Sequence, residues 1–131
     1  MRDRIDGSIV NRAWAFVAVT LVGTVAGQLV LKYAIARYGE IPRDFAGAAA
    51  FIGHALVDPL VLLSLALAFG AALAWIAAVS RLSLSSAYPF MSLAFVGTAL
   101  FSVLLLGESV SILRWAGIVV VVVGLVIVAK G

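Results

Sequence analysis

Residues 83–115 read SLSSAYPFMSLAFVGTALFSVLLLGESVSILRW, and the rest of the chain is organised around this stretch. It contains an apolar run long enough to cross a bilayer, with Pro89 in its first turns. Because proline deprives a backbone carbonyl of its helical hydrogen bond, we predict a hinge at Pro89. Glu108 lies at the other end of the run, and Arg114 follows it at the start of the next run. Together these ends favour a transport element over a simple anchor.

The composition indicates an integral membrane protein. The chain has 131 residues, of which 65% are hydrophobic and 11% charged, and its mean hydropathy is +1.23. A water-soluble domain of this size needs more polar surface to cover its core. The formal charge of +3 is spread over ends and loops, which suits membrane lipid and argues against nucleic acid. With no cysteine and one histidine, neither a metal site nor a cofactor is expected.

The apolar runs predict the fold class, which is an all-α membrane protein with four transmembrane helices in a single domain over residues 1–131. A shorter apolar segment in the first loop predicts an interfacial helix. The four helices are expected at about residues 13–32, 60–79, 86–106 and 113–129, and the interfacial helix at about 45–57. Asp44 and Asp58 are predicted to cap the helices that follow them, and Pro59 suits a first helical position.

Four spans place both chain ends and the turn at 80–86 on the same side of the membrane. Positive residues on that side are Arg2, Arg4, Arg12, Arg81 and Lys130. Positive residues on the other side are Lys32, Arg37, Arg43 and Arg114. The excess favours cytoplasmic termini, while dual insertion of an antiparallel pair stays open. Two aromatic belts are expected, one with Trp14, Trp75 and Tyr88 and the other with Tyr33, Tyr38 and Trp115.

The end of the first helix carries small and polar residues at helical spacing. Gly23 and Gly27 are four apart, which predicts close approach of a second helix. Gln28 and Lys32 are also four apart, and polar groups within a span usually face the bundle interior and a ligand. The alternatives are that Lys32 reaches the lipid headgroups and that Gln28 only hydrogen-bonds a neighbouring helix.

Four further positions are candidates for a role in function, and each has a simpler alternative. Arg81 is expected to contact a phosphate, or else only to mark the topology. Glu108 is predicted to form a loop ion pair with Arg114. The simpler alternative is that this pair only holds the turn between the two helices in place. Trp75 is expected to line the site or to belong to an aromatic belt, and Tyr88 to line the site or to begin a helix.

The last helix carries Gly117 and Gly124, seven residues apart and so on one face. We predict a dimer interface there, and the alternative is a lipid-facing helix with incidental glycines. His54 is expected to be a solvated interface residue rather than a ligand. The sequence contains no nucleophile–base pair, phosphate-cradling loop or paired carboxylates, so we do not expect an enzyme.

Several of these motifs resemble one transporter family. They are the GQxxxK end of the first helix, AYP opening the third, LGES before the fourth and the paired glycines within it. They resemble the EamA/small-multidrug-resistance branch of the drug/metabolite transporter superfamily. Within that branch, VAGQLVLKYA (25–34) and SSAYPFMSLAFV (85–96) are similar to ArnE/ArnF-type subunits of the undecaprenyl-phosphate-aminoarabinose flippase. The resemblance covers most of residues 13–130, although the loop at 33–58 is longer than in ArnE.

One position departs from the multidrug exporters of this branch. Those proton-coupled proteins carry a membrane-embedded glutamate three residues before the glycine that aligns with Gly27. Here that position is Thr24, and no acid lies within an apolar run. The ArnE-like group also lacks this acid, so the resemblance implies a flippase for a polyprenyl-phosphate-linked sugar in the bacterial inner membrane, acting in lipopolysaccharide modification.

The resemblance also implies roles for particular residues. A phosphate would be held near one face by Arg81 and near the other by Lys32 and Arg114. The sugar would be bound by Thr24, Gln28, Trp75, Tyr88 and Ser92. Four helices enclose little volume, so a homodimer or a heterodimer with a sister subunit is expected. The alternatives are an exporter of small solutes or cations, and a non-transporting subunit that assembles with a glycosyltransferase.

Overall fold

The structure is a computed structural model, and it describes residues 7–131. Arg2 and Arg4, which entered the charge count above, lie outside the described residues. The elements are α1 (Gly7–Ala36), α2 (Phe45–Leu56), α3 (Pro59–Val79), α4 (Leu84–Ala87), the 3₁₀ helix η1 (Tyr88–Met91), α5 (Ser92–Leu106) and α6 (Ile112–Lys130). No strand occurs in this part of the chain.

The predicted fold class is confirmed. Four helical segments are long and apolar enough to cross a membrane, namely α1, α3, the segment Leu84–Leu106 and α6, and α2 is the shorter apolar helix of the first loop. Large apolar side chains cover the outside of the molecule, with Phe69 67% exposed and Leu104 65% exposed. Such a surface is stable against lipid chains rather than against water.

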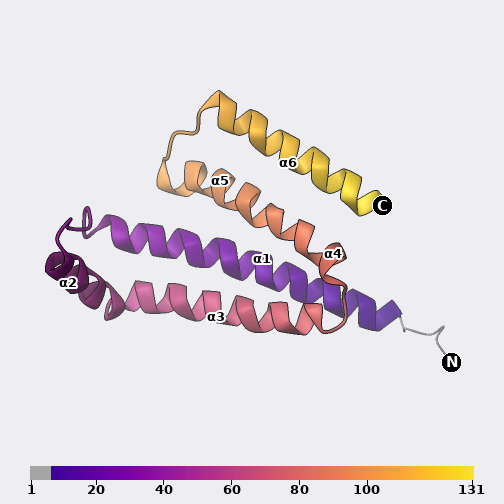
Figure 1. Cartoon of the computed structure of the whole chain (residues 1–131), viewed down its shortest axis with the longest axis horizontal. Coiled ribbons are helices and arrows are strands. Elements are labelled where there is room, and N and C mark those ends of the chain that lie inside the picture. Colours follow the sequence, from indigo (N-terminus) through magenta and orange to yellow (C-terminus); the bar gives the residue numbers. More distant parts are fainter. Residues whose placement is uncertain (1–6) are drawn as a thin grey trace.

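The helices form an open bundle in which α1 and α3 lie side by side, α5 packs against α1, and α6 packs against α5 and η1 (Figure 1). The start of α1 and the end of α6 lie at one end of the bundle, which we call the terminal end. The 37–58 segment and the turn after α5 lie at the opposite loop end. This arrangement of the four spans agrees with the predicted order.

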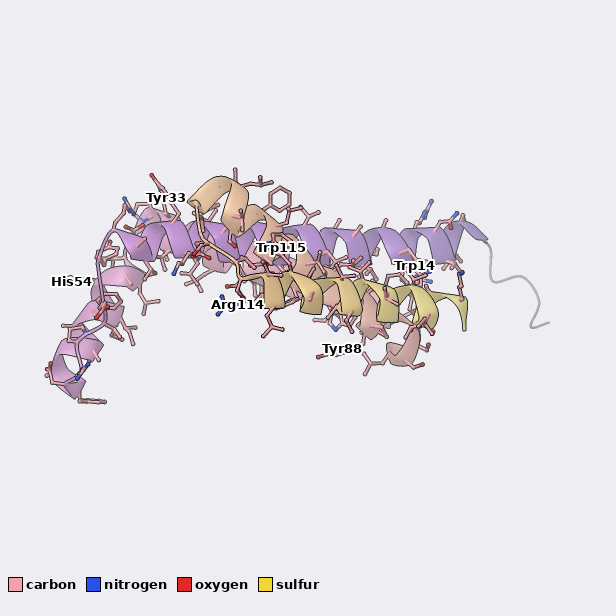
Figure 2. The ribbon with its side chains drawn as sticks, turned by 90° about the horizontal axis from the view of Figure 1, so that it is seen from above. Trp14, Tyr33, His54, Tyr88, Arg114 and Trp115 are labelled. Carbon is pink, nitrogen blue, oxygen red and sulfur yellow. The ribbon has the colours of Figure 1, made fainter. Side chains whose placement is uncertain are left out.

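Four of the six residues predicted to form the aromatic belts can be placed along the length of the bundle. Trp14 and Tyr88 lie toward the terminal end, whereas Tyr33 and Trp115 lie toward the loop end (Figure 2). His54 is carried by α2, which extends away from the bundle at the loop end. The order of these residues along the bundle is the one expected for two aromatic belts.

Helix α1 is longer than the predicted helix at 13–32, at both ends. Residues 7–12 extend the helix at its start, and they contain no proline, which would have interrupted it. At the other end, Ala34 is fully buried and packs with Ala55 of α2 and Val61 of α3. Tertiary packing therefore carries the helix past Lys32 to Ala36.

The predicted close approach at Gly23 and Gly27 is confirmed, and the partner is α3. A Cβ atom at Gly27 would lie 3.2 Å from the backbone oxygen of Ser64. A Cβ atom at Gly23 would lie 3.1 Å from the Cβ of Ala71. The two backbones approach this closely because neither glycine has a side chain, as in other small-residue membrane interfaces.

The third span is not the single helix predicted at 86–106, because α4, η1 and α5 follow one another within it. Pro89 has no amide hydrogen, so the carbonyl of Ser85 cannot receive a helical bond from it. The Ser92 hydroxyl donates to the Pro89 carbonyl at 2.7 Å, which satisfies a backbone oxygen beside the 3₁₀ turn. The irregular turn thus coincides with the predicted hinge.

Both predicted caps are confirmed at the loop end. The Asp44 carboxylate accepts a bond of 2.7 Å from the Gly47 amide at the start of α2. The Asp58 carboxylate accepts bonds of 2.8 Å and 3.3 Å from the amides of Leu60 and Val61 at the start of α3. These bonds satisfy amides that have no partner within their helices.

Helix α6 occupies the edge of the bundle. It buries Ile118 and Leu125, which are seven residues apart and so lie on one face. A Cβ atom at Gly117 or Gly124 would meet nothing within 4 Å in the described chain. The two glycines therefore lie beside open space, and the dimer interface stays a prediction.

Candidate functional site

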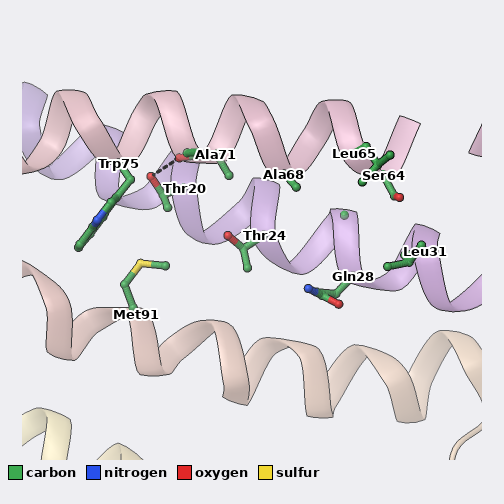
Figure 3. Close-up of a pocket in the computed structure, with 12 residues that line it drawn as sticks. Thr20, Thr24, Gln28, Leu31, Ser64, Leu65, Ala68, Ala71, Trp75 and Met91 are labelled. Carbon is green, nitrogen blue, oxygen red and sulfur yellow. Dashed lines mark hydrogen bonds between the residues drawn. The ribbon is translucent and has the colours of Figure 1, made fainter. Parts of the chain in front are cut away.

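A cavity of about 420 Å³ lies between the α1–α3 pair and η1 (Figure 3). Its volume lies in the range of about 300–1,000 Å³ that is typical of small-molecule sites. The polar, aromatic and sulfur-containing side chains in its lining are Thr20, Thr24, Gln28, Ser64, Trp75 and Met91. None of the described lining residues is charged.

Three of the predicted substrate-contact residues come together here, namely Thr24, Gln28 and Trp75. Thr20, Thr24 and Gln28 recur every four residues and so share one face of α1. Figure 3 shows Thr24 and Gln28 pointing from α1 into the space that faces the third span, with Trp75 and Met91 at its terminal end.

The polar groups of the cavity differ in their availability for a ligand. The Thr20 hydroxyl lies 2.8 Å from the Phe16 carbonyl oxygen and 3.2 Å from that of Ala71, and the Ser64 hydroxyl donates to Val61 at 2.7 Å. By contrast, Thr24 and Gln28 have no side-chain hydrogen bond within residues 7–131. A hydroxyl has one donor and an amide has two donors and an acceptor, so both remain free to bind a polar ligand.

Two aromatic pairs lie toward the terminal end of the bundle, and one of them includes the lining residue Trp75. The rings of Trp75 and Tyr88 meet edge to face with centroids 6.1 Å apart, and those of Trp14 and Phe90 meet at 4.9 Å. Tyr88 therefore contacts a lining residue but does not line the cavity itself. Ser92 is also outside the lining, and its hydroxyl donates to the Pro89 carbonyl.

The three predicted phosphate-binding cations lie outside the cavity lining. Arg81 is exposed in the turn after α3, and Arg114 is exposed in the first turn of α6, so they lie at opposite ends of the bundle. Lys32 lies one helical turn beyond Gln28 on the same face of α1. Of the three, Lys32 is therefore the cation placed at the rim of the cavity.

The predicted ion pair between Glu108 and Arg114 is replaced by another. The Glu108 carboxylate lies 3.6 Å from the Lys32 ammonium. Gly107, with a φ of 67°, ends α5 in the left-handed conformation, and the Glu108 amide donates to the Ser102 carbonyl at 3.2 Å. This cap turns the chain so that Glu108 joins the loop end of α5 to the end of α1.

A second polar cluster centres on Asp58 at the loop end. Its carboxylate accepts bonds of 2.7 Å from Arg37 and 2.6 Å from the Tyr38 hydroxyl, in addition to capping α3. The hydrogen bond from Tyr38 lowers the pKa of Asp58, helped by backbone amides and by Arg37 against the opposing effect of burial. The same hydrogen bond raises the pKa of Tyr38. The cluster anchors the first loop to α3.

Among the polar, aromatic and sulfur-containing lining residues, three were not predicted from the sequence, namely Thr20, Ser64 and Met91. Thr20 had a signal, because it begins the four-residue spacing that continues through Thr24 and Gln28. Ser64 and Met91 had none, because Ser64 enters the site through the pairing of α3 with α1, and Met91 enters through the 3₁₀ turn that contains Pro89.

Comparison with known families decides the class of protein. The sequence matches the EamA-like transporter family over residues 8–130. The chain belongs to this family. Searches of curated proteins and of solved structures found no match. As an EamA-like protein with four apolar spans, it is a multi-pass membrane protein of a drug/metabolite transporter family whose members are transporters rather than enzymes.

Proposed function

We propose that this EamA-like protein is a subunit of a flippase that carries a polyprenyl-phosphate-linked sugar, similar to aminoarabinose, across the bacterial inner membrane. The proposal depends chiefly on the uncharged cavity between α1, α3 and η1. Most of its lining is apolar, and we call it the polar cavity for the side chains of Thr24 and Gln28 within it. The unpartnered groups of Thr24 and Gln28 suit the hydroxyls of a sugar, and the ring of Trp75 suits its apolar face. A sugar that crosses between helices replaces its lost water bonds with such groups.

The phosphate needs positive charge where it enters and leaves the hydrocarbon, since an unpaired charge there is costly. Lys32 lies one turn beyond Gln28 at the loop end, and Arg81 lies in the exposed turn at the terminal end. In this proposal the two cations hold the phosphate before and after crossing while the polyprenyl chain stays in lipid. Arg114 adds positive charge at the loop end.

The proposed working unit is a homodimer or a heterodimer with a sister subunit. On α6, a Cβ atom at Gly117 or Gly124 would meet nothing within 4 Å in the described chain, so there is room beside these glycines. Packing of a second chain beside these glycines would form the dimer, and two copies would enclose a path that one four-helix bundle is too small to enclose. Both termini lie in the cytoplasm in this proposal, by the excess of Lys and Arg on their side.

One observation favours a second function, export of small solutes or cations. Trp75 and Met91 lie together in the cavity, and an aromatic face attracts organic cations. That function needs a coupling group other than a membrane carboxylate, because none lines the cavity. A subunit that only assembles with a glycosyltransferase would use neither property.

Translocation of a fluorescent polyprenyl-phosphate sugar in proteoliposomes tests the proposal. We expect translocation by the unmodified protein. Translocation should be about 5- to 30-fold slower with Gln28→Leu, and at least tenfold slower with Lys32→Ala and Arg81→Ala. His54→Gln, a change on α2 outside the cavity, serves as the control. Proton-linked uptake of a quaternary ammonium ion without lipid translocation would support the exporter instead, and the absence of both activities would support an assembly subunit.

A further inference from the structure

A second concavity lies on the side of α1 that faces α5. Its volume is about 380 Å³, and its lining is entirely apolar. We call it the α1–α5 groove, and the residues used below are Leu21, Val25 and Leu29 from α1 with Phe101 and Leu105 from α5. Leu21, Val25 and Leu29 are spaced by four, so they form a continuous apolar stripe along α1.

The Lys32–Glu108 ion pair lies beyond the loop end of this groove. Lys32 follows Leu29 by three residues on α1, and Glu108 follows Leu105 by three residues at the end of α5. Their charged groups are 3.6 Å apart, and their side chains are 63% and 42% exposed. The groove is thus apolar along its length and has a cation, Lys32, at its loop end. A lipid with an apolar chain and one anionic end would match this arrangement.

We propose that the α1–α5 groove binds one apolar chain of a phosphate-bearing lipid, and that the phosphate replaces Glu108 as the partner of Lys32. Glu108 would then be an internal counter-ion that occupies Lys32 until the lipid arrives. This inference depends on the proposed function for the identity of the lipid, but it concerns a surface on the other side of α1 from the polar cavity.

The strength of the ion pair suits such an exchange. An exposed pair changes an equilibrium by at most about fivefold, so a lipid phosphate can displace Glu108 at little cost. The apolar chain adds burial against Val25, Leu29 and Phe101, which supplies affinity that a free phosphate lacks. Lys32 is one turn beyond both Leu29 and Gln28, so a headgroup held there lies beside both the groove and the polar cavity.

Binding to the full chain in zwitterionic nanodiscs tests the exchange, with farnesyl phosphate, farnesol and inorganic phosphate as probes in native mass spectrometry. We expect farnesyl phosphate to bind at least tenfold more tightly than either other probe. Lys32→Gln should abolish that preference. Glu108→Gln should bind farnesyl phosphate two- to fivefold more tightly, with farnesol unchanged, because the competitor of the phosphate is gone.

Three controls fix the location of the site. Ala26→Phe fills the α1–α5 groove, which includes Ala26, and should weaken binding of farnesyl phosphate and farnesol alike. Lys130→Gln and Glu40→Gln change charge elsewhere and should have no effect. Equal binding of farnesol and farnesyl phosphate would overturn the proposal and leave only a general lipid-facing surface. Equal binding of inorganic phosphate would identify a simple anion site.

A further measurement leaves Lys32 and Glu108 unchanged, so its result does not depend on whether variants at these two positions fold. The chain has no cysteine, so spin labels at Tyr33→Cys and Ile112→Cys can report the separation of the α1 end and the α6 start. Farnesyl phosphate should change that separation, because it would release Glu108, in the loop before α6, from Lys32 near the end of α1. Farnesol should leave the separation unchanged. An unchanged separation with an unchanged Glu108→Gln affinity would overturn the exchange.

The outcome is separable from that of the translocation experiment. Failure to move a lipid-linked sugar, with farnesyl phosphate still exchanging for Glu108, would refute the flippase and retain the lipid site. The opposite result is translocation that depends on Lys32 while Glu108→Gln binds farnesyl phosphate no more tightly than the unmodified protein. That result would retain the flippase and refute the exchange.

Discussion

Replacement of Gly27 by leucine should separate α1 from α3 and destroy the polar cavity. At this position a Cβ atom would lie 3.2 Å from the Ser64 oxygen and 3.5 Å from the Leu67 Cβ. Gly27→Ala therefore requires a shift of a few tenths of an ångström. Gly27→Leu adds three more carbon atoms directed at a backbone that already lies in contact, so the helices must move apart or the side chain must leave its preferred rotamer.

The cost follows from these distances. Overpacking of this kind destabilises by about 1–3 kcal/mol, which is roughly a 5- to 150-fold change in the folding equilibrium. For Gly27→Ala the strain is offset by a gain in helix propensity of up to about 1 kcal/mol, so the net change should be close to zero. Gly70 on α3 is the matched control, because a Cβ there meets nothing within 4 Å. Gly70→Ala should be neutral or stabilising.

Unfolding of the purified protein by SDS, followed by circular dichroism, measures these free energies. We expect the order of stability to be Gly70→Ala, then the unmodified protein and Gly27→Ala together, then Gly27→Leu. Gly27→Leu should also lose ligand binding in the cavity, since Gly27 is one of its lining residues. A Gly27→Leu protein as stable as the unmodified one would refute the close packing of α1 on α3.

Three further changes test other parts of the molecule. Gln28→Leu should slow translocation by about 5- to 30-fold without altering thermal stability, because it removes hydrogen bonds of about 1–2 kcal/mol to the substrate. The pKa of Asp58 is held below its ordinary value of 3.8, so the stability from its charged form is present above that value and lost as the pH falls through the lower folded pKa. Asp58→Asn should therefore lower the melting temperature at neutral pH and flatten the loss seen in acid. Pro89→Ala should restore a helical bond and slow amide exchange around residues 88–91, as hydrogen–deuterium exchange would report.

Much of the fold could be predicted because its causes are local. A run of apolar residues long enough to cross a bilayer becomes a helix whatever its neighbours, since no other conformation satisfies its backbone in lipid. The caps at Asp44 and Asp58 depend on amides within three residues of each aspartate. The end of α1 was missed, because Ala34 is held in the helix by α2 and α3, which lie later in the chain.

The candidate site was predicted in part for the same reason. Thr24 and Gln28 share a helix face, which spacing alone predicts, and both line the cavity with Trp75. The partner of Glu108 was not predictable from spacing, because Lys32 is distant in sequence and Arg114 is near. Only the cap at Gly107 and the packing of α5 on α1 bring Glu108 to Lys32.

The position of α6 at the edge of the bundle has a consequence for biogenesis. It contributes no residue to the polar cavity and none to the α1–α5 groove. Both surfaces can therefore take shape in the nascent chain while the final span is still inside the ribosome or translocon. The last segment to enter the membrane would then pack against α5 and η1, which are already in place.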